Sequence, residues 1–189
     1  ELVLRLHRLL RASRTPYRIT FVPDPICWTE APEDLSTLRN QRIRWQRGLC
    51  ESLYLNRELL FHPQGGMVGW LAFPFAILFE CLSPVVVVIG YVTIIVAFAF
   101  SVISLEAVTA FLLADVGLGM VVSVSALLLE ELSFHIYPKP SHTLGLFAIA
   151  IVENIGYRQL NSIWRLIGFI RWISGAKASW GHMTRVASW

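Results

Sequence analysis

Residues 81–105 read CLSPVVVVIGYVTIIVAFAFSVISL and carry no charged side chain between Glu80 and Glu106. A helix needs about 20 apolar residues to cross the hydrocarbon core of a membrane, so this stretch is long enough to span one. A second apolar stretch, residues 107–129, is interrupted only by Asp115. We therefore expect two membrane-spanning helices, at about residues 82–105 and 107–129.

The charged residues lie mostly outside these two stretches. Of the 189 residues, 55% are hydrophobic and only 15% are charged, whereas soluble domains average about 25% charged residues. Residues 1–62 carry ten arginines against seven acids, and residues 153–189 carry five cations against one acid. A basic head, an apolar middle and a basic tail exclude a disordered chain and are typical of a membrane protein. Because loops rich in arginine and lysine stay in the cytosol, we expect a cytosolic head and favour two complete crossings over three.

Two further apolar segments are shorter or mixed. Residues 67–80 are too short to cross alone, so we expect an interfacial or tilted helix with Trp70 near the headgroups. Residues 143–172 begin apolar and continue with polar side chains at helical spacing, ahead of a basic tail. This pattern fits a helix on the membrane surface, and it also fits a spanning helix whose polar face lines a pathway. Its polar residues are Glu153, Asn154, Tyr157 and Arg158. We expect them to form a solvated face of the helix rather than a groove that contacts the glycan.

The basic head, residues 1–66, predicts a helix, a strand and a second helix. Leucines recur at helical spacing from Leu2, and the β-branched and aromatic run Tyr17–Val22 predicts a short strand. Proline followed by acids at residues 31–34 predicts the start of the second helix. Its expected apolar stripe consists of Leu35, Leu38, Trp45, Leu49 and Leu53. A helix followed by a strand suggests the last part of an α/β domain.

The cysteines and histidines give no sign of a metal site. Cys27, Cys50 and Cys81 are far apart in the sequence and odd in number, so we expect small buried side chains and no disulfide framework. The five histidines share no metal-ligand spacing. The chain begins at Glu1, without methionine and within a helical pattern, which suggests a piece of a longer protein.

The most informative cluster is Gln41-x-x-Arg44-Trp45. On a helix these three positions share one face, because they are spaced i, i+3 and i+4. Arginine suits two-point contact with a phosphate, and an indole can stack on the apolar face of a sugar. The alternative is a membrane-proximal helix in which Trp45 is an interfacial anchor and Arg44 is solvated.

With its surroundings, this cluster resembles the QxxRW motif of the membrane-embedded family 2 glycosyltransferases, which include cellulose, chitin, hyaluronan and poly-N-acetylglucosamine synthases. Tyr17–Pro25 resembles the family's strand after the acceptor-site helix, and Trp28–Leu35 resembles the segment leading into the QxxRW helix. Gly48 is also usual there. The motifs cover about residues 1–66, and residues 67–180 match by hydropathy. The resemblance implies a helical membrane segment attached to the C-terminal end of an α/β domain of the GT-A type, mostly α with one short strand.

The resemblance also implies roles for single residues. Trp45 would form the platform for the terminal sugar of the acceptor, and Gln41 and Arg44 would contact the nucleotide diphosphate or the acceptor. The family's general base and its divalent metal, magnesium or manganese, would belong to residues upstream of Glu1. The chain on its own would then lack catalytic residues and be inactive.

The function implied is an inverting, processive glycosyltransferase that extends a polysaccharide from a nucleotide sugar at the inner or plasma membrane, among membrane lipids and with accessory or export subunits as possible partners. Asp115 would then line a polysaccharide channel. The alternatives are a helix–helix hydrogen bond with neighbours such as Ser123 or Ser125, or a position nearer the membrane interface. Two other functions stay open. One is a single transfer to a lipid acceptor, and the other is a noncatalytic scaffold or transporter subunit. The arginine-rich head lacks the fold signatures of a nucleic-acid binder, so no nucleic-acid partner is expected.

Overall fold

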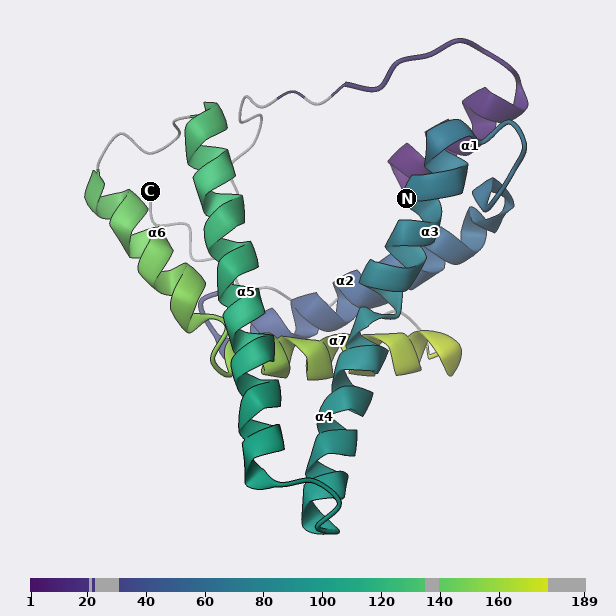
Figure 1. The fold of residues 1–189 in the computed structure, drawn as a ribbon. Helices are drawn as coiled ribbons and strands as arrows, with labels where there is room; N and C mark the ends of the chain where they lie inside the picture. Colours follow the sequence, from purple (N-terminus) through teal and green to yellow (C-terminus); the bar gives the residue numbers. More distant parts are fainter. Residues whose placement is uncertain (21, 23–30, 135–139, 177–189) are drawn as a thin grey trace. The chain divides into compact units, whose positions relative to one another are not determined.

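The computed structural model describes residues 1–20, 22, 31–134 and 140–176 of the chain (Figure 1). The described residues form helices and turns and contain no strand. They divide into two compact units, Glu1–Val86 with Ser162–Trp189, and Val87–Asn161. Each unit is described separately below.

The first unit begins with two α-helices, α1 (Leu2–Ala12) and α2 (Leu35–Leu55), followed by the single 3-10 turn η1 (Arg57–Leu59). A stretch that is mostly π-helical follows. It comprises η2 (Val68–Ala72), α3 (Phe73–Phe75) and η3 (Ala76–Cys81), and it leads into α4 (Ser83–Ala99). The end of the chain contributes most of α7 (Tyr157–Ile173) to this unit.

The core of the first unit joins α2, η1 and the stretch 68–81. Its buried members are Cys50, Leu53, Leu59, Phe73 and Cys81, and Phe169 and Trp172 of α7 pack against them. The buried positions of α2 are Ile43, Gln46, Cys50 and Leu53. The buried stripe therefore differs from the expected one, because Leu35 and Trp45 are exposed and Gln46 takes an inward position.

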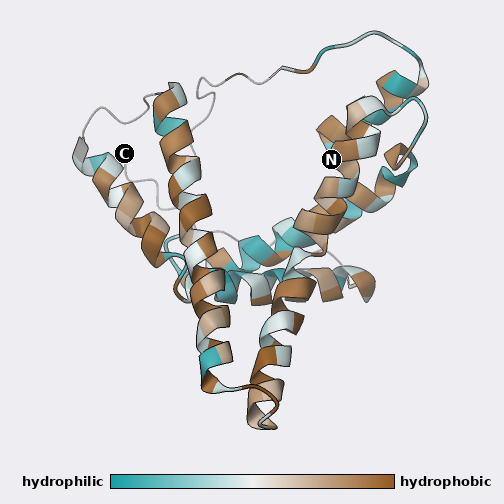
Figure 2. Cartoon of the chain, in the orientation of Figure 1, coloured by the Kyte–Doolittle hydropathy of each residue, from teal (hydrophilic) through white to brown (hydrophobic). Residues whose placement is uncertain are grey.

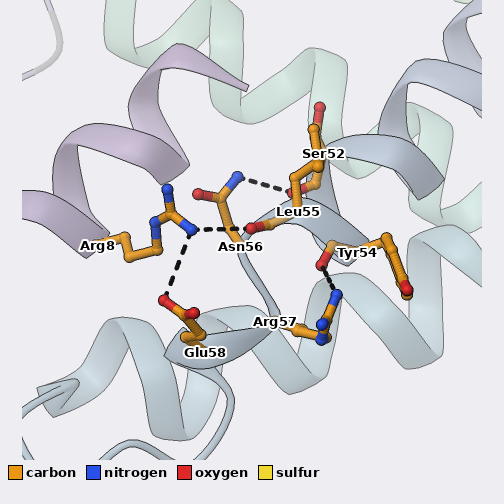
Figure 3. Close-up of polar contacts among 7 residues, drawn as sticks. All are labelled: Arg8, Ser52, Tyr54, Leu55, Asn56, Arg57 and Glu58. Carbon is orange, nitrogen blue, oxygen red and sulfur yellow. Dashed lines mark hydrogen bonds and ion pairs between the residues drawn. The ribbon is translucent and has the colours of Figure 1, made fainter.

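The corner between α2 and η1 is tied to α1 by one arginine (Figure 3). The Nη1 atom of Arg8 donates a hydrogen bond to the Leu55 carbonyl at 3.0 Å and lies 3.6 Å from the Glu58 carboxylate. The Asn56 side chain is buried at this corner and donates to the Ser52 carbonyl at 2.8 Å. Arg8 thus satisfies a carbonyl at the end of the helix, where the last carbonyls lack intrahelical donors, and the Asn56 side chain adds a second donor to the Ser52 carbonyl, which also accepts from the Asn56 N–H.

The predicted strand Tyr17–Val22 is wrong for the residues that the structure describes there. Residues 17–20 and 22 have no regular structure. A strand needs a neighbouring strand to pair its backbone N–H and C=O groups, and none is present among the described residues. The helix start also differs from the prediction, because α2 begins at Leu35 with Asp34 as its N-cap. The expected segment Trp28–Glu30 lies outside the described residues.

The second unit contains the C-terminal part of α4, α5 (Leu105–Phe134), α6 (Pro140–Val152) and the first turn of α7. Hydrophobic colouring dominates α4, α5 and α6 in Figure 2, whereas α2 and α7 are mixed. Among the described residues, two helices are long and apolar enough to cross a membrane, Val68–Ala99 and Leu105–Ser133. Residues 67–80, expected as a separate interfacial helix, thus run into the first of them with only a bend at Leu82.

The segment expected at 143–172 consists of two helices. A turn at residues 153–156 separates α6 from α7, and Gly156 adopts a φ of +90° there. Glycine tolerates this left-handed conformation without the steric cost that a Cβ atom imposes. The polar residues that the sequence places on one helix therefore belong to a turn and to the start of α7.

Candidate functional site

Helix α2 carries the three residues singled out in the sequence, Gln41, Arg44 and Trp45. All three lie in its middle, so the helix places them on one face as their spacing predicts. Gln41 and Arg44 are half-buried, and 58% of the Trp45 side chain is exposed. The indole is therefore accessible to a ligand.

The cation beside the indole is Arg42. Its guanidinium carbon lies 4.7 Å from the centre of the Trp45 ring, and its Nε atom is buried without a hydrogen-bond partner. An arginine over a tryptophan ring is a favourable cation–π arrangement. Residues three apart on a helix are neighbours, so the spacing of Arg42 and Trp45 is the sequence signal for this contact.

The opposite face of α2 is anchored by Gln46, which directly follows Trp45. Gln46 is 2% exposed. Its Nε2 atom donates to the Cys81 carbonyl at 2.9 Å, and its Oε1 atom accepts from Arg165 Nε at 2.8 Å. A buried glutamine is uncommon unless its amide is hydrogen-bonded. This anchor fixes the rotation of α2 that leaves Trp45 outside.

Pro84 makes the anchor possible. Proline has no backbone N–H, so Pro84 cannot donate to the carbonyl of Glu80 four residues earlier. The next N–H, that of Val85, donates to Leu82 rather than to Cys81. The carbonyls of Glu80 and Cys81 are thereby left for side chains, and Arg165 Nη2 donates to Glu80 O at 2.5 Å.

Arg165 connects α7 to this bend. Desolvation by burial lowers the pKa of its guanidinium from the ordinary value, and the acceptors that it contacts are the Gln46 amide and the Glu80 carbonyl. Close packing accompanies these bonds. A Cβ atom on Gly168 would lie 2.5 Å from the Ile43 carbonyl oxygen, so only glycine fits.

Two cysteine side chains, one on α2 and one on η3, lie in contact. Cys50 and Cys81 are buried and free, with their Sγ atoms 3.2 Å apart. The hydrogen bond with Cys81 and burial raise the pKa of the Cys50 thiol. The prediction of small buried side chains is confirmed for these two, and Cys27 lies outside the described residues.

The second unit holds Asp115 in a separate polar cluster. The Tyr91 hydroxyl donates to the Asp115 carboxylate at 2.5 Å, and Gln159 Nε2 donates to the Tyr91 oxygen at 3.0 Å. The predicted partners Ser123 and Ser125 are not the contacts observed; Ser123 donates instead to Glu153 at 2.8 Å.

The α6–α7 turn packs its polar side chains against α5. Asn154 is buried and accepts a hydrogen bond from Arg158 Nη1 at 3.1 Å. A Cβ atom on Gly119 would lie 2.3 Å from the Asn154 side-chain oxygen, so glycine at this position of α5 admits the turn. Of the predicted polar face, Glu153, Asn154 and Arg158 thus have protein partners.

The expected metal has no ligand set in the part of the chain that the structure describes. No three histidine, cysteine or acidic side chains come together there.

An exposed indole beside guanidinium groups, on a helix anchored from its other face, is suited to binding sugars and phosphates. Comparison of the sequence with known families gives the family of the chain. The profile of glycosyl transferase family group 2 matches residues 6–114, more than half of the chain, and the chain belongs to this family. No curated protein and no solved structure matches the chain.

Proposed function

We propose that this chain is part of an inverting glycosyltransferase that adds sugars from a nucleotide sugar to a growing polysaccharide at the cell membrane. Membership of family group 2 supports glycosyl transfer. The observation that carries the rest is the exposed Trp45 on α2, whose other face is held by Gln46. The two long apolar helices support a membrane location, and the basic head favours a cytosolic position for residues 1–66.

In this proposal Trp45 stacks on the terminal sugar of the acceptor. The cations near it, Arg42 and Arg44, favour the negative charge that develops on the departing nucleotide diphosphate. A base removes the proton of an acceptor hydroxyl, the oxygen attacks the anomeric carbon, and the bond from that carbon to the diphosphate breaks. Gln41 contacts the diphosphate or the acceptor. The base is not assigned to a residue of this chain.

The polar cluster of the second unit supports a polysaccharide as the product. Asp115, Tyr91 and Gln159 place hydroxyl, amide and carboxylate groups among apolar helices, where polar groups are costly and typically mark pathways or helix contacts. We propose that Asp115 lines the path of the glycan.

One observation favours the second candidate, transfer to a lipid acceptor. A groove of about 460 Å³ in the second unit is lined mainly by apolar side chains, with Glu153 and Tyr157 as its polar members. Such a groove suits a lipid chain with a polar end. A lipid-linked product is extracted into organic solvent, whereas a polysaccharide stays in water, where its size can be measured. This difference separates the two candidates.

Nucleotide release from membranes that contain the full protein tests the proposal. UDP-, GDP- and dTDP-sugars are supplied one at a time to the wild type, to a Gln41→Ala/Trp45→Ala variant and to Leu35→Ala. Leu35 is exposed at the start of the same helix and serves as the control. We expect one class of donor to release nucleotide, with loss of release only in the double variant. Folded protein that releases nucleotide from no donor would favour a scaffold.

A further inference from the structure

A basic pocket of about 580 Å³ lies beside the C-terminal end of α1 in the first unit. It shares no residue with the face of α2 described above. Among the residues that the structure describes, no carboxylate lines it. Its polar lining consists of His7, Arg11, Arg14, Thr15, Tyr17 and Gln64.

Arg11 is held in place and has an N–H group without an acceptor. Its Nη1 atom donates to the Gln64 carbonyl at 3.1 Å, and its guanidinium lies over the Tyr17 ring, 5.7 Å from the ring centre. Its Nε atom is buried and has no hydrogen-bond partner. A buried donor without an acceptor is unfavourable, so this group favours an incoming acceptor.

Gly66 makes room for this arginine. A Cβ atom at position 66 would lie 2.6 Å from Arg11 Nη1, and Gly66 also has a φ of +53°. The loop before the apolar helix is therefore shaped to admit the guanidinium.

Arg14 occupies a position where glycine is usual. The N–H of Thr15 donates to Leu10 O at 3.0 Å and the N–H of Arg14 to Arg11 O at 3.1 Å, the two bonds of a Schellman helix end. Arg14 has the left-handed φ of 52° that this motif requires. A residue with a Cβ atom is strained in this conformation, and glycine is not. A ligand for the exposed guanidinium would offset that strain.

His7 and Tyr17 form the neutral wall of the pocket. The Tyr17 hydroxyl and His7 Nδ1 are 2.5 Å apart. Burial and the nearby charge of Arg11 lower the pKa of His7 below its ordinary value, which favours the neutral ring. Arg11 and Arg14 therefore supply the two positive charges of the pocket.

The pocket lies where the first long apolar helix begins. Gln64 precedes the stretch Val68–Ala99 by four residues. On this stretch, 56% of Trp70 is exposed, and its indole N–H donates to the His62 carbonyl at 3.1 Å. Tryptophan is enriched at the headgroup level of membranes. We propose that the pocket binds the phosphate of an anionic phospholipid headgroup, with Arg11 and Arg14 as its two cationic contacts.

The test uses the full protein purified in neutral detergent, with dioctanoyl phosphatidylglycerol as the probe. Dioctanoyl phosphatidylcholine and inorganic phosphate are titrated in parallel. The variants are Arg11→Gln and Arg14→Gly, and Arg5→Gln is the control, because Arg5 is an exposed arginine of the same helix outside the pocket. The Kd is read from ligand-induced thermal shifts.

We expect phosphatidylglycerol to bind the wild type and Arg5→Gln equally, and the other two variants about tenfold more weakly, since a charged hydrogen bond is worth at least about 1.4 kcal/mol. Arg14→Gly should also raise the thermal midpoint without lipid, because glycine relieves the left-handed strain. Its loss of binding therefore cannot come from misfolding. Equal binding by Arg14→Gly and the wild type would overturn the proposal. Inorganic phosphate that binds as tightly as the lipid would overturn the lipid assignment.

Discussion

At the scale of single residues, Pro84 and Arg165 decide how α2 is held. Pro84 leaves the carbonyl of Glu80 without its helical donor, and the forked guanidinium of Arg165 reaches that carbonyl and Gln46 together. Two donors at a fixed angle are a property of arginine and not of lysine. The orientation of the helix that bears Trp45 therefore depends on a residue more than a hundred positions away.

The first prediction concerns this guanidinium. Arg165→Lys should lower the thermal midpoint and the rate of sugar transfer together, because the ammonium group cannot bond both acceptors and one hydrogen bond to a charged group, worth about 1.5–3 kcal/mol, is lost. Arg171→Lys is the matched control, since Arg171 is exposed on the same helix. Wild-type stability of Arg165→Lys would show that the anchor does not hold α2.

The second prediction compares Gly168, at the contact between α7 and α2, with Gly48, an exposed glycine of α2. Gly168→Ala should destabilise the protein by about 1–3 kcal/mol, because the added Cβ would lie 2.5 Å from the Ile43 carbonyl oxygen. A Cβ atom added at Gly48 would have no other atom within 4 Å. Gly48→Ala should therefore stabilise α2 by about 0.5–1 kcal/mol. Thermal unfolding followed by tryptophan fluorescence measures both. Shifts of the same sign would contradict the packing described.

At the scale of elements, α2 depends on its N-cap. The Asp34 carboxylate accepts hydrogen bonds from the Thr37 N–H at 2.8 Å, the Ser36 hydroxyl at 2.5 Å and the Thr37 hydroxyl at 2.6 Å. These bonds lower the pKa of Asp34 from its ordinary value of 3.8 to about 2. The cap therefore contributes stability above pH 4, and this contribution disappears as the pH falls through 2.

The third prediction follows from the lowered pKa of Asp34. Asp34→Ala should lower the thermal midpoint at pH 7, and the gap from the wild type should narrow progressively between pH 4 and pH 2. Glu33→Ala removes a neighbouring charge outside the cap and should change little. A gap that stays constant down to pH 2 would mean that the ionised cap is not the source of the effect.

Helices α4 and α5 are linked by Tyr91 and Asp115, and the fourth prediction tests this link. In a double-mutant cycle, Tyr91→Phe and Asp115→Asn should show a coupling energy of about 1 kcal/mol, typical of hydrogen bonds between membrane helices. Thr109, which donates to the Leu105 carbonyl of its own helix, supplies the control. Tyr91→Phe and Thr109→Ala should be additive. Additive effects of Tyr91→Phe and Asp115→Asn would contradict a link between these two side chains.

At the scale of the whole chain, the apolar periodicity predicted much of the fold. It predicted two long apolar helices, an N-terminal helix and the helix that carries Trp45. It did not place the turn between the long helices, because the sequence offers no charge before Glu106. The structure turns at residues 100–104, where Ser101 has a φ of +56° and Ser104 accepts a hydrogen bond from the Ala107 N–H.

The candidate site was predicted in part. Spacing placed Gln41, Arg44 and Trp45 on one helical face, which needs only local geometry. Spacing could not reveal Gln46 as the buried anchor, because glutamine is ordinarily exposed and its partners are carbonyls freed by Pro84 and a side chain on α7. The strand prediction failed for a related reason, since a strand depends on a neighbour that local pattern does not supply.

The proposal that Trp45 is the platform for the acceptor sugar is tested most directly by chain extension. Membranes with the full protein are supplied with the active donor, and incorporated sugar is measured for the wild type, Trp45→Ala, Trp45→Phe and Leu35→Ala at equal expression. We expect Trp45→Ala to lose about 100-fold or more, equivalent to about 2.7 kcal/mol of lost stabilisation. Trp45→Phe should retain part of the activity, because a smaller ring can still stack, and Leu35→Ala should match the wild type. Near-normal extension by Trp45→Ala would contradict the account.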